Sequence, residues 1–493
     1  MSRYGGLKWQ AGLLAAAGMF EYAMQLILPM ILVRQLQPDV FGDYRLLWLL
    51  AASSLALFPL FLPQSLFYFL PRQQPSQRGL IVGNAWWFCG ASGCAAGGLV
   101  WLALPMMSPA MAHLRTYGAV VPVFLALWVL ASLADTLPIA DGRAAWQAAS
   151  TVAVALLRTL LLGGVALTVD GFPAVALAMV VFALIKAATV PMYAWTTAMP
   201  FAFRFDASLM ATQLRYAFPL AVSNSLFLMR AQADQWVAAS QVSAAGVALV
   251  SIGAVGLGFS TLVRQPLNNA VLPRLNQFMV QHDLAGAAAL LRKGYTANAL
   301  VLPAVLGFFI VCAAELIEIV YTPRYLGAAV LMQIYLLGQL GCVLASGHLM
   351  GVIHRGAQAV KINAVALALS VFLSALGVIW FGLPGTVAGS VLALWLAEGA
   401  ALVVVSRALG ASVLGLVDLG LIARVGVLVL AGGLLGHWLR VTWMSDWQPW
   451  ARLLGAGAAY WVAVLPGLAY LAQRAGFMLR RPAAADSAGG PLS

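Results

Sequence analysis

Apolar residues form long unbroken blocks along most of this chain, and short polar connections separate the blocks. Each block holds about 20 residues, the length that a helix needs to cross a hydrocarbon core of ~30 Å. The blocks lack the alternation of apolar and polar positions that is typical of membrane-spanning β-strands. Because backbone N–H and C=O groups in lipid must be paired within the protein, the pattern predicts an all-α polytopic membrane protein.

The blocks predict about fourteen transmembrane helices, in two sets of six followed by a pair. The first set covers residues 8–33, 41–70, 79–105, 117–140, 146–168 and 172–197. The second set covers residues 210–238, 242–272, 295–320, 327–352, 361–381 and 385–406. The pair covers residues 416–437 and 451–473.

Short sequence matches recur at equivalent places in the two sets of six. A Pro-Arg pair ends the second and eighth blocks, a Gly-x-Pro triplet opens the sixth and twelfth, and an arginine precedes the fifth and eleventh. The residues are Pro71, Arg72, Pro273, Arg274, Gly171, Pro173, Gly382, Pro384, Arg143 and Arg355. The matches indicate a repeat, and ordinary loop punctuation is the alternative interpretation. Because six spans separate the copies, both copies enter the membrane in the same direction.

The repeat predicts two parallel six-helix bundles around a central cavity, plus two C-terminal helices. We place the N-terminal bundle at residues 1–205, the C-terminal bundle at 206–408 and the two additional helices at 409–475. The last residues, 476–493, are rich in Pro, Ala, Gly and Ser, and we expect a disordered cytoplasmic tail there.

Composition supports a membrane environment. The chain is 63% hydrophobic and 9% charged, whereas roughly a quarter of the residues in soluble domains are charged. The net charge of +12 comes from single Lys and Arg residues scattered along the loops, so we expect no nucleic-acid partner. When the N-terminus is cytoplasmic, most loop cations fall on the inner side and only a few, including Arg45, on the outer side. Both termini are therefore predicted to be cytoplasmic.

Residues 32–44, LVRQLQPDVFGDY, resemble the opening turn of polysaccharide transporters in the multidrug/oligosaccharidyl-lipid/polysaccharide exporter superfamily. The Pro-Arg pair that ends the second span and the segment 215–220, RYAFPL, are similar to further motifs of that family. Asp234 followed by Gly246 looks like the family's seventh span and its exit turn, although the tyrosine usual after that glycine is absent. The resemblance covers the whole length in topology and only short motifs in residues.

The resemblance implies a flippase, such as an O-antigen flippase, that moves a polyprenyl-pyrophosphate-linked oligosaccharide across the bacterial inner membrane by alternating access. Such a surface polysaccharide precursor would be the main partner, together with membrane lipids, a polysaccharide polymerase and glycosyltransferases. The lipid II flippase branch of the superfamily also has fourteen spans. The arginine cluster expected in that branch's first spans is missing, because Glu21 is the only charge between Lys8 and Arg34.

Ionisable residues inside the predicted spans are the main candidates for function. Each such charge costs at least ~2.5–3.5 kcal/mol at mid-bilayer if it is unpaired in lipid. These residues are Glu21, Asp135, Arg158, Lys186, Arg230, Asp234, Arg264 and Glu398. They must therefore face a wet cavity or one another.

Three of the cations are candidates for substrate binding. Arg158 and Lys186 lie about midway along consecutive predicted spans, and Arg264 lies in the eighth span. A bidentate arginine and a point-charge lysine suit a pyrophosphate, so we hypothesise that these three side chains line the cavity and neutralise it. Ion pairing between helices, with carboxylates of other spans, is the alternative interpretation.

The intramembrane acids have two predicted roles. Glu21, Asp135 and Glu398 are candidates for a proton-coupled switch or for ion pairs with the cavity cations. Arg230 and Asp234 are four residues apart on one predicted helix, and this spacing predicts a structural ion pair.

Amides beside prolines form a further group of cavity candidates. Gln265 and Asn268 follow Arg264 in the eighth span, and Gln64 lies beside Pro63 in the second. Amides could bind sugar hydroxyls there, or they could satisfy carbonyl groups that a proline kink leaves free. The sequence leaves both interpretations open.

Two other functions compete with the flippase. A polyprenyl-phosphate-sugar glycosyltransferase would use outer acidic residues such as Asp39 and Asp43, yet this loop is short and N-capping explains Asp39. An ion-coupled multidrug exporter of the same superfamily should carry cavity carboxylates without compensating cations, whereas this chain has both. We therefore predict a transporter without catalytic residues. The four cysteines lack metal-ligand spacing, so we expect neither a metal nor a cofactor.

Overall fold

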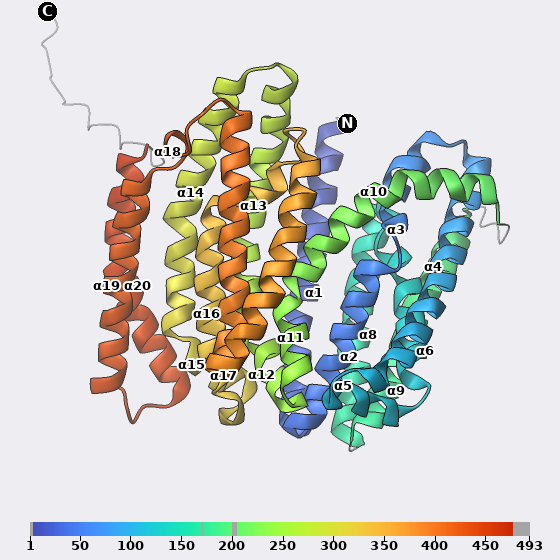
Figure 1. The fold of residues 1–493 in the computed structure, drawn as a ribbon, viewed down its shortest axis with the longest axis horizontal. Coiled ribbons are helices and arrows are strands. Elements are labelled where there is room, and N and C mark those ends of the chain that lie inside the picture. The colour runs from blue at the N-terminus through green and yellow to red at the C-terminus, as the bar shows by residue number, and fades with distance from the viewer. Residues whose placement is uncertain (1–2, 170, 200–204, 477–493) are drawn as a thin grey trace, which may run out of the picture. The chain divides into compact units, whose positions relative to one another are not determined.

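The computed structural model describes residues 3–169, 171–199 and 205–476, and every regular element in these ranges is a helix (Figure 1). Among the described residues, eleven helical segments are long and apolar enough to cross a membrane. One of them, α17 (Gly356–Ala408), contains two of the predicted spans, joined by non-helical backbone at Gly382. The protein is therefore a multi-pass α-helical membrane protein.

Two more predicted spans lie on helices outside that set. They are α10 (Ala207–Ala231) and α16 (Ala328–Leu340), which is a shorter apolar helix. The eleven segments, the second span within α17, and these two helices together account for the fourteen predicted spans. The predicted all-α polytopic fold is confirmed. The predicted disordered tail lies almost wholly outside the described residues.

Contacts between helices divide the chain into two compact units. The first unit contains Met1–Ile252, Val320–Ala328 and Asn363–Ala393, and the second contains Gly253–Ile319, Ala329–Ile362 and Leu394–Ser493. The predicted bundle boundaries follow the sequence repeat rather than these contacts, and they stay a prediction.

The first unit is built mainly from the first seven predicted spans, and several of their helices are interrupted. Its long helices are α1 (Arg3–Gln35), α2 (Pro38–Leu57), α4 (Pro75–Ala103), α6 (Val120–Ala131), α8 (Ala144–Thr168), α9 (Phe172–Thr196) and α10. Shorter pieces are α3 (Leu62–Phe69), α5 (Pro109–His113), η4 (Ser132–Asp135), α7 (Leu137–Ala140), α11 (Ala233–Gln241) and α12 (Ala244–Gly253).

Two predicted spans of the first unit break within their length. The second span breaks between α2 and α3, where Leu60 (φ 47°) and Phe61 (φ 59°) have left-handed backbone. The fourth span changes from α6 to the 3-10 turn η4 and then to α7. Bulky residues adopt positive φ only at a cost of ~1–3 kcal/mol each, so the surrounding structure must hold this turn in place.

The sixth and twelfth spans begin in the same way. Gly171 (φ 95°) precedes α9, and Gly382 (φ 63°) separates the two spans of α17. In both places a proline follows two residues later, in the first turn after the glycine. Positive φ is accessible to glycine without strain, which gives a physical reason for the recurrent Gly-x-Pro triplet.

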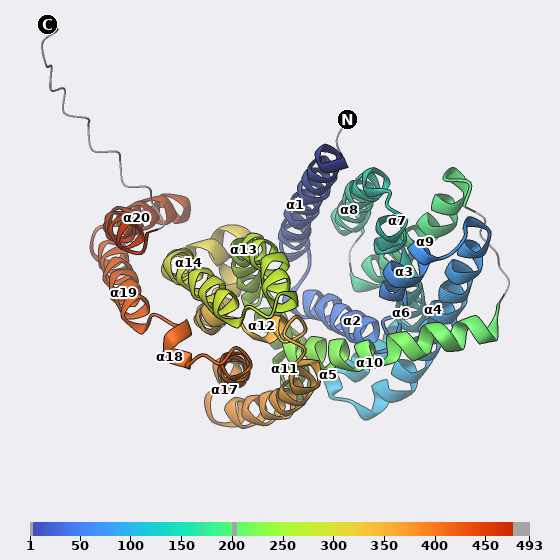
Figure 2. The same cartoon turned by 90° about the horizontal axis from the view of Figure 1, so that it is seen from above.

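Most of the chain after Ile252 belongs to the second unit. The exceptions are Val320–Ala328 and Asn363–Ala393, which belong to the first unit. The helices of the second unit include α13 (Gly256–Val280), α14 (Leu284–Val311), α15 (Ala313–Tyr321), α16, α18 (Val413–Leu416), α19 (Leu419–Thr442) and α20 (Pro449–Arg474). Figure 1 and Figure 2 both show the last two long helices, α19 and α20, side by side.

Hydrogen bonds and ion pairs anchor α19 and α20 to α14 and α15. The Tyr460 hydroxyl donates to the Ala304 carbonyl at 2.7 Å. Arg440 Nη1 lies 3.4 Å from Glu315 Oε2, and Arg452 Nη2 lies 2.9 Å from Glu318 Oε2. The two additional helices are thus packed against the rest of the second unit.

Candidate functional site

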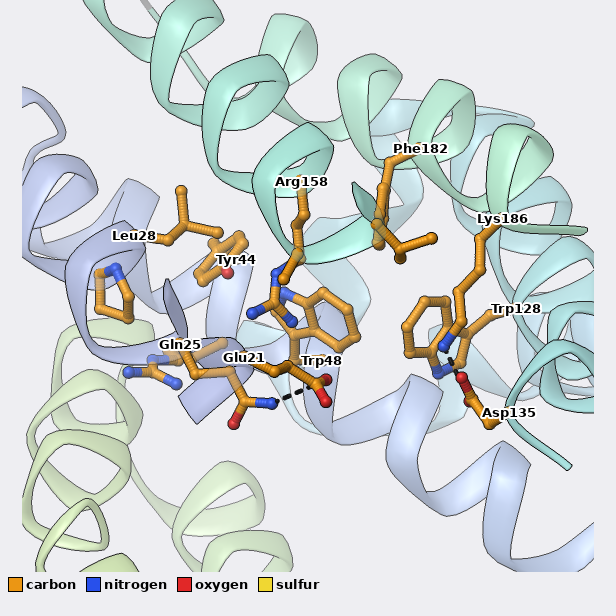
Figure 3. A pocket seen from close by; sticks show the side chains of 14 residues that line it. Glu21, Gln25, Leu28, Tyr44, Trp48, Trp128, Asp135, Arg158, Phe182 and Lys186 are labelled. Atoms are coloured by element: carbon orange, nitrogen blue, oxygen red, sulfur yellow. Dashed lines mark hydrogen bonds and ion pairs between the residues drawn. The ribbon is translucent and has the colours of Figure 1, made fainter. Parts of the chain in front are cut away.

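A polar cavity of about 400 Å³ lies inside the first unit (Figure 3). Its walls come from α1, α2, α6, α8 and α9, and η4 contributes Asp135. The structure brings together four residues that the sequence singled out in separate spans: Glu21, Asp135, Arg158 and Lys186. These four charged side chains therefore face a common cavity. This placement avoids the free-energy cost of unpaired charges in lipid.

Arg158 points from α8 into the cavity in Figure 3. Its Nε and Nη2 atoms are buried and have no hydrogen-bond partner within the described part of the chain. A buried guanidinium donor without a partner loses its hydration and gains nothing in return, which costs about 1–3 kcal/mol per group. Water or an anionic ligand in the cavity would supply the missing acceptors.

Arg45, on α2, is a second arginine in this cavity. Its Nε and Nη2 atoms are also buried without a hydrogen-bond partner among the described residues. The Arg45 guanidinium lies 5.1 Å from the centre of the Phe41 ring, so an aromatic face holds it from one side. Tyr44, Arg45 and Arg158 all line this cavity, so the two arginines share one site with a tyrosine.

Lys186 has a different environment from the two arginines. Its Nζ lies 2.8 Å from Asp135 Oδ2 and 4.7 Å from the centre of the Trp128 ring. The side chain of Lys186 is 12% exposed and that of Asp135 is 57% exposed, so the lysine is largely buried and the aspartate is accessible to solvent. For this cation the pairing between helices that the sequence left open is present.

Glu21 reaches the cavity from α1, and Gln25 Nε2 donates to its carboxylate at 3.2 Å. Arg45, Arg158 and Lys186 carry three positive charges, whereas Glu21 and Asp135 carry two negative charges. The cavity lining thus has an excess of one positive charge. Among its charged side chains, the buried nitrogens without a hydrogen-bond partner in the described part of the chain belong to the two arginines.

The residues predicted for the eighth span lie on α13 in the second unit. Arg264 Nε is buried and has no hydrogen-bond partner in the described ranges. Gln265 is exposed and Asn268 is half-buried. The helix is continuous through this stretch, and the predicted eighth span breaks earlier, at Ala254 and Val255. That Arg264 shares a cavity with Arg158 and Lys186 stays a prediction.

Glu398 has a well-defined structural role in the second unit. Its Oε2 accepts hydrogen bonds from the backbone N–H groups of Ser346 at 2.9 Å and Gly347 at 3.2 Å. These residues join the 3-10 turns η6 (Gly341–Leu344) and η7 (Gly347–Leu349), where helical hydrogen bonds are lost. A role in proton coupling stays a prediction for this residue.

Arg230 and Asp234 do not lie on one continuous helix. Arg230 belongs to the last turn of α10, and Asp234 belongs to the first turn of α11, with Gln232 between the two helices. The Arg230 guanidinium lies 5.5 Å from the centre of the Phe227 ring. The spacing argument for their ion pair assumed an uninterrupted helix, and the pair stays a prediction.

Gln64 lines a second, smaller cavity of about 110 Å³ in the first unit. Asp135 belongs to the linings of both cavities. The two cavities therefore meet at the carboxylate that holds Lys186.

Sequence reasoning missed Arg45 and the aromatic walls of the main cavity, Tyr44, Trp48 and Trp128. The charge count placed Arg45 on the outer side of the membrane, whereas the structure places it in the cavity lining. A signal was present in the sequence, since Phe41, Arg45 and Trp48 are spaced four and then three residues apart. Such positions share one face of a helix.

Comparisons with known proteins agree with a membrane transporter fold. No protein-family model matches the chain. No curated protein matches it either. A solved structure described as lipid II flippase MurJ in an inward closed conformation is similar, with a TM-score of 0.69 and 11% identity. That match covers 94% of this chain and 99% of the flippase.

Multidrug transporters are also similar in structure. A multidrug resistance MATE family transporter of the MOP superfamily, in an inward-facing conformation, has a TM-score of 0.65 and 12% identity over 79% of this chain and 94% of its own. The Vibrio cholerae MATE transporter VcmN has a TM-score of 0.53 and 15% identity over 82% of this chain and 98% of its own. The predicted resemblance to this superfamily is thus confirmed at the level of the fold.

Proposed function

We propose that this protein is a flippase that moves a polyprenyl-pyrophosphate-linked oligosaccharide across the bacterial inner membrane by alternating access. The fold shared with a lipid II flippase and with MATE transporters supports transport as the general activity. The carried molecule would be a surface polysaccharide precursor. Both termini would lie in the cytoplasm, and a polymerase and glycosyltransferases would act before and after the transport step.

The observation that carries this proposal is the pair of cavity arginines whose buried guanidinium nitrogens lack hydrogen-bond partners among the described residues. Arg45 and Arg158 each present buried guanidinium nitrogens without acceptors in the part of the chain that the structure describes. A pyrophosphate offers several anionic oxygens, and guanidinium groups bind such oxygens through paired, charge-assisted hydrogen bonds. The ligand would supply the acceptors that the protein lacks.

The same observation argues against a cationic cargo. A carrier for hydrophobic cations needs unpaired carboxylates in its cavity, and here one of the two carboxylates, Asp135, is engaged by Lys186 at 2.8 Å. The net excess of positive charge would repel a cation at a site of low dielectric. An anionic headgroup is favoured over a multidrug cation for this reason.

The enzymatic alternative depended on outer acidic residues. Asp43 is buried and accepts a hydrogen bond from the Tyr117 hydroxyl at 2.6 Å, and His113 Nδ1 lies 3.4 Å from the same oxygen. Its carboxylate therefore joins α2 to η3 (Leu114–Tyr117). This structural engagement leaves no observation that favours a glycosyltransferase.

A transport assay with the full-length protein in proteoliposomes tests the proposal. We expect Arg158→Ala and Arg45→Ala each to lower the translocation rate of a polyprenyl-pyrophosphate-linked oligosaccharide by about tenfold to a hundredfold, the range for loss of a charge-assisted hydrogen bond. Arg474→Ala is the matched control, because Arg474 is an exposed arginine at the end of α20. Unchanged transport in both cavity variants, at normal levels of folded protein, would contradict the proposal.

A further inference from the structure

The smaller cavity of the first unit has the chemistry of a site for hydroxyl groups. Its lining combines two amides, two hydroxyls and a carboxylate: Gln64, Asn224, Ser132, Thr136 and Asp135. The remaining lining residues are apolar. A few polar groups that converge on an otherwise apolar cavity are typical of a ligand site.

The two amides are available for a ligand. Gln64 on α3 and Asn224 on α10 are half-buried, and within the described ranges neither side chain has a hydrogen bond to the protein. The neighbouring serine on α10, Ser225, is engaged instead, since its hydroxyl donates to the Ala56 carbonyl at 2.6 Å. A half-buried amide without partners retains two donors and an acceptor for hydroxyl groups.

The hydroxyls and the carboxylate, from η4 and the residue that follows it, add acceptors to the lining. Ser132 Oγ donates to the Val129 carbonyl at 2.7 Å, and Thr136 Oγ1 donates to the Leu133 carbonyl at 3.3 Å. Each hydroxyl keeps lone pairs that can accept from a ligand. Asp135 uses Oδ2 for Lys186, so Oδ1 remains able to accept.

Broken helices form two walls of this cavity. Pro59 and Phe61 belong to the left-handed turn between α2 and α3, and Asp135 ends the 3-10 turn η4. Irregular backbone at membrane depth is tolerated only where protein covers it or where it lines a water-filled cavity. The polar lining agrees with the second condition, so polar ligand groups can enter without being transferred into hydrocarbon.

Size and position relate this cavity to the main one. Its volume of about 110 Å³ is below the ~300–1,000 Å³ of sites that enclose a whole ligand. The main cavity of about 400 Å³ shares Asp135 with it. One ligand could therefore place an anionic group beside Arg45 and Arg158 and a hydroxyl-bearing group beside Gln64 and Asn224.

We infer that the smaller cavity is the sugar subsite of the transporter, in which Gln64 and Asn224 bind hydroxyl groups of the glycan nearest to the pyrophosphate. This inference rests on the proposed function and adds specificity to it. The arginines recognise the charge that every polyprenyl pyrophosphate carries, whereas the amides recognise the attached sugar. An unloaded carrier lipid would then bind more weakly than a glycosylated one.

Binding of two probes to the full-length protein in nanodiscs tests this inference. The probes are a short-chain polyprenyl pyrophosphate and the same lipid with a disaccharide attached, and native mass spectrometry measures their dissociation constants. We expect Gln64→Ala and Asn224→Ala each to weaken binding of the glycosylated probe by about tenfold and to leave the unglycosylated probe unchanged. Gln473→Ala is the matched control, because Gln473 is an exposed amide on α20.

A near-isosteric variant, Gln64→Met, separates loss of the amide from loss of packing. If it folds with normal thermal stability and still binds the glycosylated probe as tightly as the unaltered protein, the sugar subsite is refuted. Equal weakening of both probes by the amide variants would also refute it. Arg158→Ala reports on the proposed function separately, since it should weaken both probes, and unchanged binding of both would contradict the anion site alone.

Discussion

Two groups of charged side chains, one in each unit, differ in whether they have a partner within the protein. In the second unit, Glu315 lies against Arg440, Glu318 against Arg452, and Glu398 against two backbone N–H groups. In the cavity of the first unit, the Nε and Nη2 atoms of Arg45 and Arg158 have no acceptor in the described part of the chain.

This difference distinguishes two roles. The paired charges stabilise the fold, whereas the two cavity arginines are candidates for binding a ligand. A buried charge with a partner stabilises the elements that it joins, and its removal leaves the partner uncompensated. A buried charge without a partner destabilises the empty protein, so its retention suggests a functional benefit. Substitution of a paired charge should therefore reduce stability more than transport. Substitution of an arginine without a partner should reduce transport more than stability.

Glu315→Ala should produce the largest loss of stability. The Glu315 side chain is 3% exposed and the Arg440 side chain 20%, so the variant leaves a largely buried guanidinium without its carboxylate. We expect the free energy of unfolding to fall by about 3 kcal/mol. Unfolding in mixed detergent micelles measures this change. Glu318→Ala is the matched control, because both members of that pair are more exposed and its effect should stay below about 1 kcal/mol.

Glu398→Ala should have the next largest effect on stability. The variant removes the acceptor of the Ser346 and Gly347 N–H groups, and we expect a loss of about 2 kcal/mol in the free energy of unfolding. Glu398→Gln keeps an acceptor oxygen and should lose less. If the glutamine variant is as unstable as the alanine variant, hydrogen bonding to the turn is not the main role of Glu398. A proton-dependent transport rate that only Glu398→Gln abolishes would support the predicted coupling role.

Arg158→Met should change stability by less than about 1 kcal/mol, or increase it, because it replaces an uncompensated buried charge by an apolar side chain of similar length. The same variant should lose transport of the anionic lipid. Thermal unfolding and translocation, measured on one preparation, check the two effects together. A destabilisation as large as that of Glu315→Ala would show that Arg158 is a structural charge, and the contrast between the units would fail.

Much of the fold could be predicted from the sequence, because the physical requirement was strong. Apolar blocks of bilayer length must be helices, and the all-α fold with about fourteen spans followed from that requirement. The sequence also identified Glu21, Asp135, Arg158 and Lys186 from the cost of charge in lipid, and all four line one cavity.

Other features depended on information that a single sequence does not display. Arg45 lies near the end of a span, where a charge count reflects topology and does not reveal which side of the helix faces a cavity. The left-handed turn at Leu60 and Phe61 has no glycine to mark it. The role of Glu398 depends on a turn 51 and 52 residues away in the chain. Such long-range contacts require the tertiary structure.

The smallest expected effect concerns Asp206, the N-cap residue of α10. Hydrogen bonds from the Leu209 backbone N–H and then from the Ser208 hydroxyl hold the pKa of this carboxyl below its ordinary value of 3.8. A carboxyl whose pKa is lower in the folded state stabilises the fold above its unfolded pKa, and this contribution is lost as the pH falls through the folded pKa. The hydrogen-exchange protection factors in the first turn of α10, which correct for the intrinsic pH dependence of exchange, should therefore fall only below about pH 4. Asp206→Asn should abolish this acid dependence while it keeps an acceptor for the helix N-terminus, because asparagine is also a favoured cap. If the acid dependence persists in that variant, another group in the first unit controls the start of α10, and the local contribution of this charge is negligible.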